Sequence, residues 1–359
     1  MTPDFAQHPL DAEGLRSRVD KAVDDHLAHQ ADVLDQVGED LAPLMDALAD
    51  LLRGGKRLRP AFCYWGWRGA GGADLPELVT AAASLELLQA SALIHDDVMD
   101  ASDTRRGQPS AHRRFQAMHD DAGWPGSGGA FGMGAAILLG DLCLGWSGTM
   151  YDESGLDERA LRRGRPVYDL MRTEVMSGQY LDMLEQARGC GTVQSALRVM
   201  EFKSAKYTIE RPLHLGAALA GASPDMRDAL SAYGLPLGIA FQLRDDVLGV
   251  FGDPGMTGKP AGDDLREGKR TVLVALALRA ATPVQATVVR SRLGDPALDD
   301  AGVEALRSII VDTGALAACE EMIESYAAEA TGTMRVAPIT SEAREALEDL
   351  AVAATLRYG

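Results

Sequence analysis

The spacing of apolar residues constrains the fold of this chain more than any other feature. Between Val19 and Leu52, valine and leucine recur at intervals of mostly three and four residues, which places them on one face of a helix. Later segments continue this helical pattern, and the sequence shows neither strand-like alternation nor a repeat of fixed period. We therefore predict an all-α fold, with breaks or kinks at Pro43, Pro212 and Pro236. The other predicted helical segments are residues 75–100, 135–150, 166–184, 197–221, 225–251, 271–281 and 303–358.

The composition favours one helical domain. Aromatic residues make up only 5% of the chain, whereas alanine and leucine, which are strong helix formers, are abundant. None of the glycine-rich stretches resembles a long flexible linker. We predict a single-domain helical bundle over residues 19–359, in which alanine-rich helices pack around a central cavity. Residues 1–18 are expected to be poorly ordered, because the start of the chain lacks a strong apolar face.

Charge and cysteine spacing exclude several functional classes. The net charge is −18 at pH 7, so the surface repels phosphate backbones and a nucleic acid is not expected as a partner. The four cysteines are far apart, which argues against a zinc site and a disulfide framework. The N-terminus lacks the features of a signal peptide. The longest apolar stretch, residues 134–146, contains Asp141 and is too short to span a bilayer. We expect a soluble cytoplasmic protein.

Two pairs of adjacent aspartates each follow a long apolar run. In the first, Asp96 and Asp100 are four residues apart and share one helical face, with Asp97 beside them. Carboxylates at the C-terminal end of a helix are destabilised by the negative end of the helix dipole, so a bound cation would stabilise them. Mg²⁺ prefers oxygen ligands such as these carboxylates. The alternative is a solvated turn that is acidic by chance. Asp245-Asp246 repeats the pattern of paired aspartates after an apolar run, which makes this alternative less favoured. The two pairs could face each other across one cavity and bind several metal ions.

Basic residues flank both motifs, against the acidic trend of the chain. Two glycines precede the first basic cluster, and glycine lets a backbone approach an anion closely. Taken alone, each of these basic residues would be interpreted as an ordinary charged residue on the surface. Together with the aspartates, they indicate diphosphate groups held by Mg²⁺ and by charge-assisted hydrogen bonds. These positions are Lys56, Arg57, Arg59, Arg105, Arg106, Lys203, Lys206, Lys259, Lys269 and Arg270.

An ordered series of motifs between Gly54 and Arg270 resembles the trans-isoprenyl diphosphate synthase (polyprenyl synthetase) family. A lone DDxxD motif is weak, whereas the whole series in this order is specific. The matching segments are GGKRLRP (54–60), LIHDDVMD (93–100), RRGQP (105–109), GDLCL (140–144), GQYLD (178–182), KSAKYT (203–208), FQLRDD (241–246), FGDPGMTGKPAGDD (251–264) and EGKRT (267–271).

The resemblance implies a homodimeric prenyltransferase that joins isopentenyl diphosphate to an allylic diphosphate (dimethylallyl, geranyl or farnesyl) with three Mg²⁺ ions. It assigns the residues as follows. Metal would bind Asp96, Asp100 and Asp245, supported by Asp97 and Asp246. The allylic diphosphate would contact Arg105, Lys203, Lys259 and Lys269, and isopentenyl diphosphate would contact Lys56, Arg57, Arg59, Gln89 and Arg106. The developing carbocation would face Ser204, Tyr207 and Gln242, with Lys203, Tyr207 and Gln242 as the catalytic set, and Gln179 and Asp182 would brace metal-bound water.

The sequence departs from the family pattern at two positions. The second acidic motif of the family usually ends in a third aspartate, where this chain has Gly249. Because the first aspartate of that motif is present, we expect activity, and we expect Gly249→Asp to preserve it or to lower the Mg²⁺ requirement. Gln89 stands where the family often has a histidine. Glutamine still donates a hydrogen bond to a phosphate oxygen.

The first motif also bears on product length. In the family, bulky aromatic residues four or five positions before this motif stop growth at short products. Here the positions are Ala92 and Ser91, both small, with Leu88 further along the helix, and the two-residue insertion of many bacterial farnesyl diphosphate synthases is absent. Geranylgeranyl diphosphate is the expected product, and a longer polyprenyl chain is the alternative.

Two other functions compete with this interpretation. A class I terpene cyclase also carries a DDxxD motif, but its second metal motif is an Asn/Asp, Ser/Thr, Glu triad and it needs no isopentenyl site. A non-catalytic regulatory subunit of a heteromeric synthase often loses an acidic motif, whereas this chain keeps the first and part of the second. Both alternatives predict that the pure protein does not elongate an allylic primer.

Overall fold

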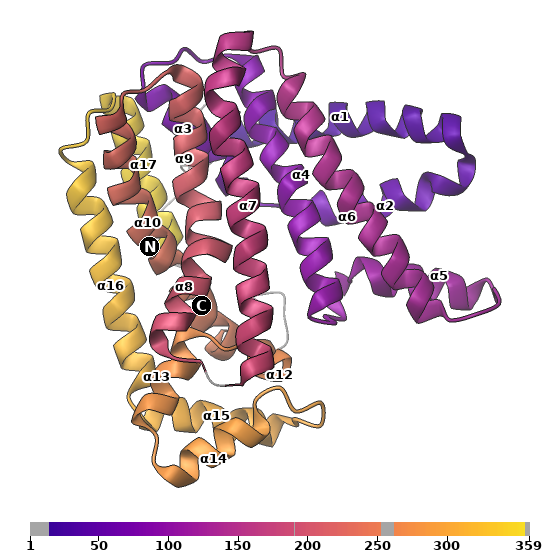
Figure 1. Cartoon of the computed structure of the whole chain (residues 1–359), viewed down its shortest axis with the longest axis vertical. Coiled ribbons are helices and arrows are strands. Elements are labelled where there is room, and N and C mark those ends of the chain that lie inside the picture. Colours follow the sequence, from indigo (N-terminus) through magenta and orange to yellow (C-terminus); the bar gives the residue numbers. More distant parts are fainter. Residues whose placement is uncertain (1–13, 190, 253–261, 356–359) are drawn as a thin grey trace, which may run out of the picture. The chain divides into compact units, whose positions relative to one another are not determined.

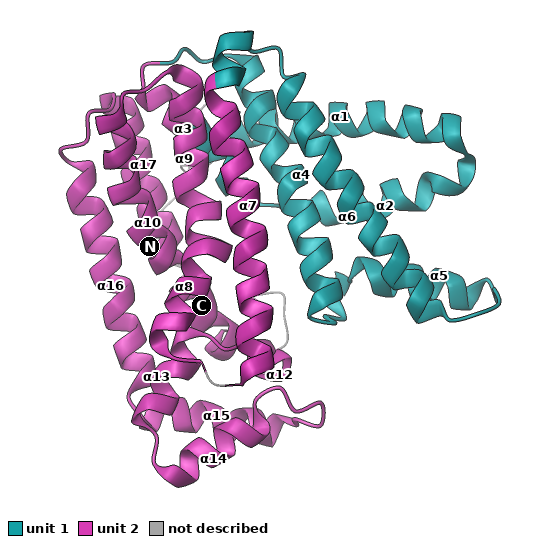
Figure 2. Ribbon diagram, viewed as in Figure 1, with its two compact units in different colours: residues 1–64, 72–162 teal, residues 65–71, 163–359 magenta. Residues whose placement is uncertain are grey.

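The computed structural model describes residues 14–189, 191–252 and 262–355 (Figure 1). Their contacts group the chain into two compact units (Figure 2). Unit 1 comprises residues 1–64 and 72–162, and unit 2 comprises residues 65–71 and 163–359. Both units are helical, which confirms the predicted all-α class, whereas the single-domain boundary at residue 19 stays a prediction.

In unit 1 the helix α4 (Pro76–Met99) is central. It packs against α1 and α6, and residues on all its sides, such as Leu78, Leu85 and Leu87, are fully buried. An all-round apolar helix is expected at such a position. The other elements are α1 (Leu15–Val37), η2 (Glu39–Leu41), α2 (Ala42–Leu52), the start of α3 (Leu58–Gly69), β1 (Thr104–Arg105), β2 (Gln108–Pro109), α5 (Ala111–Asp121), α6 (Gly128–Asp152) and the start of α7 (Glu158–Arg188).

Unit 2 is built around α10 (Pro224–Phe251), which packs against η3 and α16. Both η3 and the end of α10 carry predicted site residues. Figure 1 shows α13, α14 and α15 gathered at one end of the unit. The remaining elements are α8 (Val193–Met200), the π-helix η3 (Glu201–Glu210), α9 (Arg211–Ala220), α12 (Asp263–Glu267), α13 (Val272–Ala280), α14 (Pro283–Arg292), α15 (Asp300–Asp312), α16 (Ala315–Met334) and α17 (Ser341–Thr355).

Several element boundaries differ from the sequence-based prediction. The first helical segment breaks at Gly38, whereas Pro43 lies in the first turn of α2, where its missing N–H is not needed. The helix predicted over residues 135–150 begins earlier, at Gly128, because the Ser127 side chain accepts a hydrogen bond from the Ala130 N–H and caps the helix. The hairpin β1–β2 was not predicted, because two-residue strands are too short to show alternation.

The N-terminal expectation differs from the structure at residues 15–18. Helix α1 begins at Leu15, which is buried, and Arg18 forms an ion pair with Asp74 at 2.7 Å. Both contacts hold the first turn of α1 in unit 1. Residues 1–13 lie outside the described residues.

Two helices, α4 and α6, are long and apolar enough to cross a membrane by length and composition. The same test is passed by the core helices of soluble proteins, and α4 is mostly buried within the structure. The expectation of a soluble, cytoplasmic protein without a membrane span stays a prediction.

Candidate active site

The first acidic motif lies at the C-terminal end of α4, and its charge is compensated within unit 1. Arg105 Nε donates to Asp97 Oδ1 at 2.9 Å, and its guanidinium is 3.9 Å from Asp96. The hairpin places Arg105 there, since it pairs with Gln108 in the β1–β2 register. Asp97 is buried and bonded to Arg105, so the geometry favours a supporting role for it. Asp96 is the carboxylate of this pair that is more accessible to a cation.

The loop between α2 and α3 is built around Arg57. Arg57 has a positive φ of 55°, is buried, and binds Glu86 at 2.7 Å and Asp20 at 2.6 Å. Burial alone would lower the pKa of Arg57, but the two carboxylates raise it. These ion pairs occupy the guanidinium, so we assign Arg57 to holding the loop rather than to the predicted contact with a diphosphate. Glu86 and Asp20 were missed by sequence reasoning, because nothing in their spacing links them to Arg57.

Arg106 reaches the same region from the hairpin. Its Nη1 donates to the carbonyl oxygens of Leu51 at 2.7 Å and Arg53 at 3.3 Å, and burial lowers its pKa. The hairpin and the end of α2 are thereby joined. Among the other predicted cations of this group, Arg59 is half-buried and Lys56 is exposed.

The three residues predicted to control product length, which precede the first motif on α4, differ in burial. Ser91 and Leu88 are 3% and 2% exposed, whereas Ala92 is only half-buried. Ala92 is therefore the most exposed of the three positions. The Gln89 Oε1 atom is buried and lacks a hydrogen-bond partner among the described residues. His95 lies 3.1 Å from the Ile137 carbonyl oxygen, which makes it a structural contact between α4 and α6.

The second acidic motif lies near the end of α10 in unit 2. Asp246 is buried and accepts a hydrogen bond from Gln242 Nε2 at 2.9 Å. Burial, together with the neighbouring Asp264, raises the pKa of Asp246 to about 8. Asp245 is less buried than Asp246, so it is the more accessible of the two to a cation.

Asp264 is a third carboxylate of this group that the sequence analysis did not single out. It binds Lys269 Nζ at 3.0 Å, and Glu267 binds the same ammonium at 2.6 Å. Burial alone would lower the pKa of Lys269, but these carboxylates raise it well above its usual value. A Cβ built on Gly249 would lie 1.9 Å from Asp264 Oδ2. The expectation that Gly249→Asp is tolerated is therefore at odds with the structure, because the Asp264 carboxylate fills the space above Gly249.

Lys203 and Tyr207 lie on the π-helix η3, whose wider turn is unusual and is often found at functional sites. Lys203 Nζ donates to Asp182 Oδ2 of α7 at 2.7 Å, which joins two of the predicted motifs. Tyr207 is buried, and Ser204 is half-buried. Lys259 lies outside the described residues.

The described carboxylates do not form a self-contained metal site. Among residues 14–189, 191–252 and 262–355, no three His, Cys, Asp or Glu side chains converge to hold a metal ion. Mg²⁺ characteristically keeps water and shares its coordination with substrate phosphates. One or two aspartates per group therefore fit a Mg²⁺ ion completed by diphosphate oxygens.

Comparison with known proteins agrees with this chemistry. A sequence profile of the polyprenyl synthetase family matches residues 42–310. A geranylfarnesyl diphosphate synthase of Aeropyrum pernix is 34% identical over 299 residues, which cover 82% of this chain and 87% of the relative. A geranylgeranyl diphosphate synthase of Saccharolobus solfataricus is 31% identical and covers 83% and 85%.

A solved structure extends the similarity to nearly the whole chain. It is a geranylgeranyl pyrophosphate synthase from Corynebacterium glutamicum, complexed with isoprenyl diphosphate and magnesium. Its TM-score is 0.92 at 41% identity, covering 99% of this chain and 100% of that chain. The fold and the motifs thus define an all-α prenyltransferase. The chain belongs to the polyprenyl synthetase family.

Proposed function

We propose that this prenyltransferase extends allylic diphosphates with isopentenyl diphosphate to geranylgeranyl diphosphate. The small side chain of half-buried Ala92 carries the proposal for product length, because it leaves room for a growing tail beside α4. Similarity to synthases named for geranylgeranyl and geranylfarnesyl products supports a product longer than farnesyl.

The family resemblance divides the binding residues into two groups. We propose that Asp96, Asp100 and Asp245 hold three Mg²⁺ ions, which would neutralise the allylic diphosphate as a leaving group. Arg105, Lys203 and Lys269 are each paired with a carboxylate, but their side chains are 16%, 22% and 23% exposed, against 7% for Arg57, so a diphosphate oxygen can reach them and replace that partner. Lys259 belongs with them by resemblance, and Lys56, Arg59, Arg106 and Gln89 would bind isopentenyl diphosphate.

The chain supplies orientation and electrostatic stabilisation rather than a dedicated base. When the allylic C1–O bond breaks, the cation needs nearby oxygen dipoles and protection from water. Gln242, Tyr207 and Ser204 would provide the dipoles. The double bond of isopentenyl diphosphate attacks C1, and the departing diphosphate accepts the proton that leaves as the new alkene forms.

Incubation of the pure protein with isopentenyl diphosphate, Mg²⁺ and labelled allylic primers tests the proposal directly. Chromatography of the products should show a C20 alcohol after dephosphorylation. A main product of C15, C25 or longer would overturn the assigned length. Failure to elongate any primer would favour a regulatory subunit, and a cyclic hydrocarbon from a single prenyl diphosphate would favour a terpene cyclase.

Ala92→Phe should shorten the main product toward farnesyl diphosphate while largely preserving turnover. The phenyl ring would fill the space beside α4 that the tail needs. Leu88→Phe is the matched control, because Leu88 is 2% exposed in the core of unit 1, so the ring there should lower thermal stability instead. An unchanged product distribution for a folded Ala92→Phe variant would show that the tail runs elsewhere.

We propose that a second copy of the chain covers the exposed face of α6. One face of this helix is buried against unit 1, while the other carries Phe131, Ile137 and Leu138, which are 38%, 41% and 63% exposed. Between Phe131 and Ile137, the space beside Gly134 is open among the described residues. A small residue between large apolar ones lets a second helix approach closely, which supports a homodimer.

Leu138→Arg should convert the dimer to a monomer, because an unpaired charge would be buried at the centre of this face. Val284→Arg, at a 75% exposed position of α14, is the matched control and should remain dimeric. Light scattering coupled to gel filtration measures both masses. A wild-type protein that is monomeric at micromolar concentration, or a dimeric Leu138→Arg variant, would contradict the assignment of α6.

A further inference from the structure

The position of Lys269 is determined by the turn that ends α12. Gly268 terminates the helix at a φ of +78°, a conformation that side chains other than glycine rarely adopt. The Lys269 backbone N–H then donates to the Asp264 carbonyl oxygen at 3.0 Å. The Lys269 ammonium turns back onto Asp264 and Glu267. A shift of this turn would therefore move the ammonium directly.

The connection between α14 and α15 touches this turn through backbone alone. The Gly294 N–H donates to the Leu265 carbonyl oxygen at 3.0 Å. A Cβ built on Gly294 would lie 3.0 Å from Gly268 Cα, and a Cβ built on Gly268 would lie 2.9 Å from Gly294 Cα. The two backbones are thus in direct contact, with no space between them for even a methyl group.

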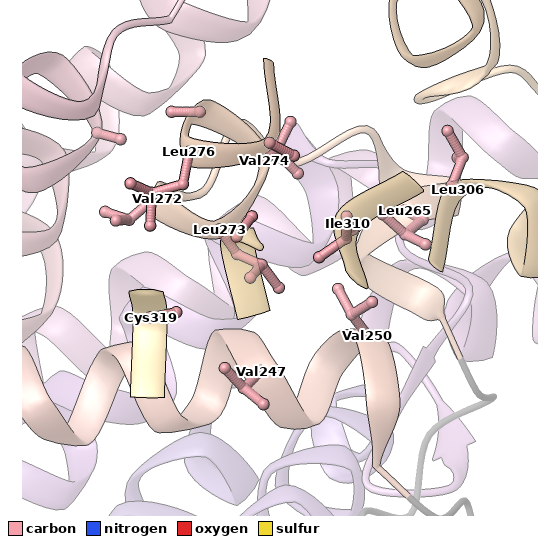
Figure 3. Close-up of a cluster of buried hydrophobic side chains, with 14 of the residues drawn as sticks. Val247, Val250, Leu265, Val272, Leu273, Val274, Leu276, Leu306, Ile310 and Cys319 are labelled. Atoms are coloured by element: carbon pink, nitrogen blue, oxygen red, sulfur yellow. The ribbon is translucent and has the colours of Figure 1, made fainter. Parts of the chain in front are cut away.

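The rest of α12 is anchored independently. Leu265 is 1% exposed and belongs to the same buried cluster as Val250, Leu306 and Ile310 (Figure 3). Arg266 binds Asp300 of α15 at 2.6 Å. Because Leu265 is packed in this core, whereas the Arg266–Asp300 pair is exposed and weak, burial of Leu265 is the contact that resists movement of α12 as a whole. A group inserted between Gly294 and Gly268 therefore displaces most directly the turn that precedes Lys269.

We infer that Gly294 is a positioning residue for Lys269. It lies outside every motif that identified the site, and it acts by allowing the α14–α15 connection to support the turn at Gly268. This inference rests on the proposed role of Lys269 in binding the allylic diphosphate. A methyl group at position 294 would displace Gly268 by a few tenths of an ångström, and the ammonium with it.

Comparison of Gly294→Ala with Gly314→Ala separates this contact from backbone strain. Gly314 has a nearly equal φ of +75°, but a Cβ there meets nothing within 4 Å among the described residues. Both variants should lower the melting temperature. Only Gly294→Ala should raise KM for the allylic substrate and lower kcat, together by about three- to tenfold, because small misplacements of binding groups are costly. KM for isopentenyl diphosphate should stay unchanged.

A double-mutant cycle with Lys269→Ala completes the test. If Gly294 acts through Lys269, Gly294→Ala should have no further kinetic effect once Lys269 is alanine. Full additivity of the two changes, or normal allylic kinetics in a folded Gly294→Ala variant, would overturn the inference. Wild-type allylic kinetics in Lys269→Ala alone would instead overturn the proposed role of Lys269, so the two failures are distinguishable.

Discussion

Asp96→Asn should lower kcat by about two to three orders of magnitude while leaving the fold intact, because a neutral amide is a poor ligand for Mg²⁺. The half-buried Asp96 lies beside Arg105, so the substitution removes a charge without opening a cavity. Asp245→Asn should act in the same direction in unit 2. Steady-state turnover at ordinary Mg²⁺ concentration, with circular dichroism as a check of folding, measures both effects.

Asp24→Asn is the matched control for these variants. Asp24 also belongs to an adjacent pair of aspartates, but it is exposed on α1, and its substitution should leave turnover unchanged. If Asp96→Asn or Asp245→Asn retained wild-type turnover, the corresponding aspartate would not be a metal ligand. Recovery of part of the activity at raised Mg²⁺ would point to weakened metal binding as the cause.

Gly249→Asp should reduce turnover by about tenfold or more, since displaced active-site groups cost rate steeply. The new Cβ would lie 1.9 Å from Asp264 Oδ2 and 2.5 Å from Asp264 Cγ, so the Asp264 carboxylate, which binds Lys269 through Oδ1, would have to shift. The added carboxylate would also increase repulsion near Asp246, whose pKa is already raised by burial and by Asp264. Turnover and the Mg²⁺ dependence of the rate measure the outcome.

Gly332→Asp adds the same charge to a helix, at a position in α16 where a Cβ meets nothing within 4 Å among the described residues, and it should behave as wild type. The double variant Gly249→Asp with Asp264→Gly removes the carboxylate that the new side chain would meet, so it should recover part of the lost activity. A fully active Gly249→Asp variant would show that Asp264 moves aside at no cost to the site.

The sequence by itself determined the helical class and the family, and it supplied the proposed site residues. Helical periodicity is local, so the long helix with the first aspartate motif was predicted to within one residue at each end, as α4 shows. The motif series from residue 54 to 271 likewise needs no coordinates. Spacing could not show which charged residues are already paired, because the partners come from distant segments.

Only the tertiary structure decided the contacts that change the interpretation. Arg57 and Arg59 look alike in the sequence, but Arg57 is buried between Glu86 and Asp20. Ser91 and Ala92 are both small, but Ser91 is buried in the core and Ala92 is not. From the sequence, Gly249 indicates a missing metal ligand. In the structure, the carboxylate of Asp264, fifteen residues further along the chain, occupies the space next to Gly249. Each of these differences depends on the space around one side chain. That space is set by segments distant in the sequence, and local sequence patterns do not show which segments pack there.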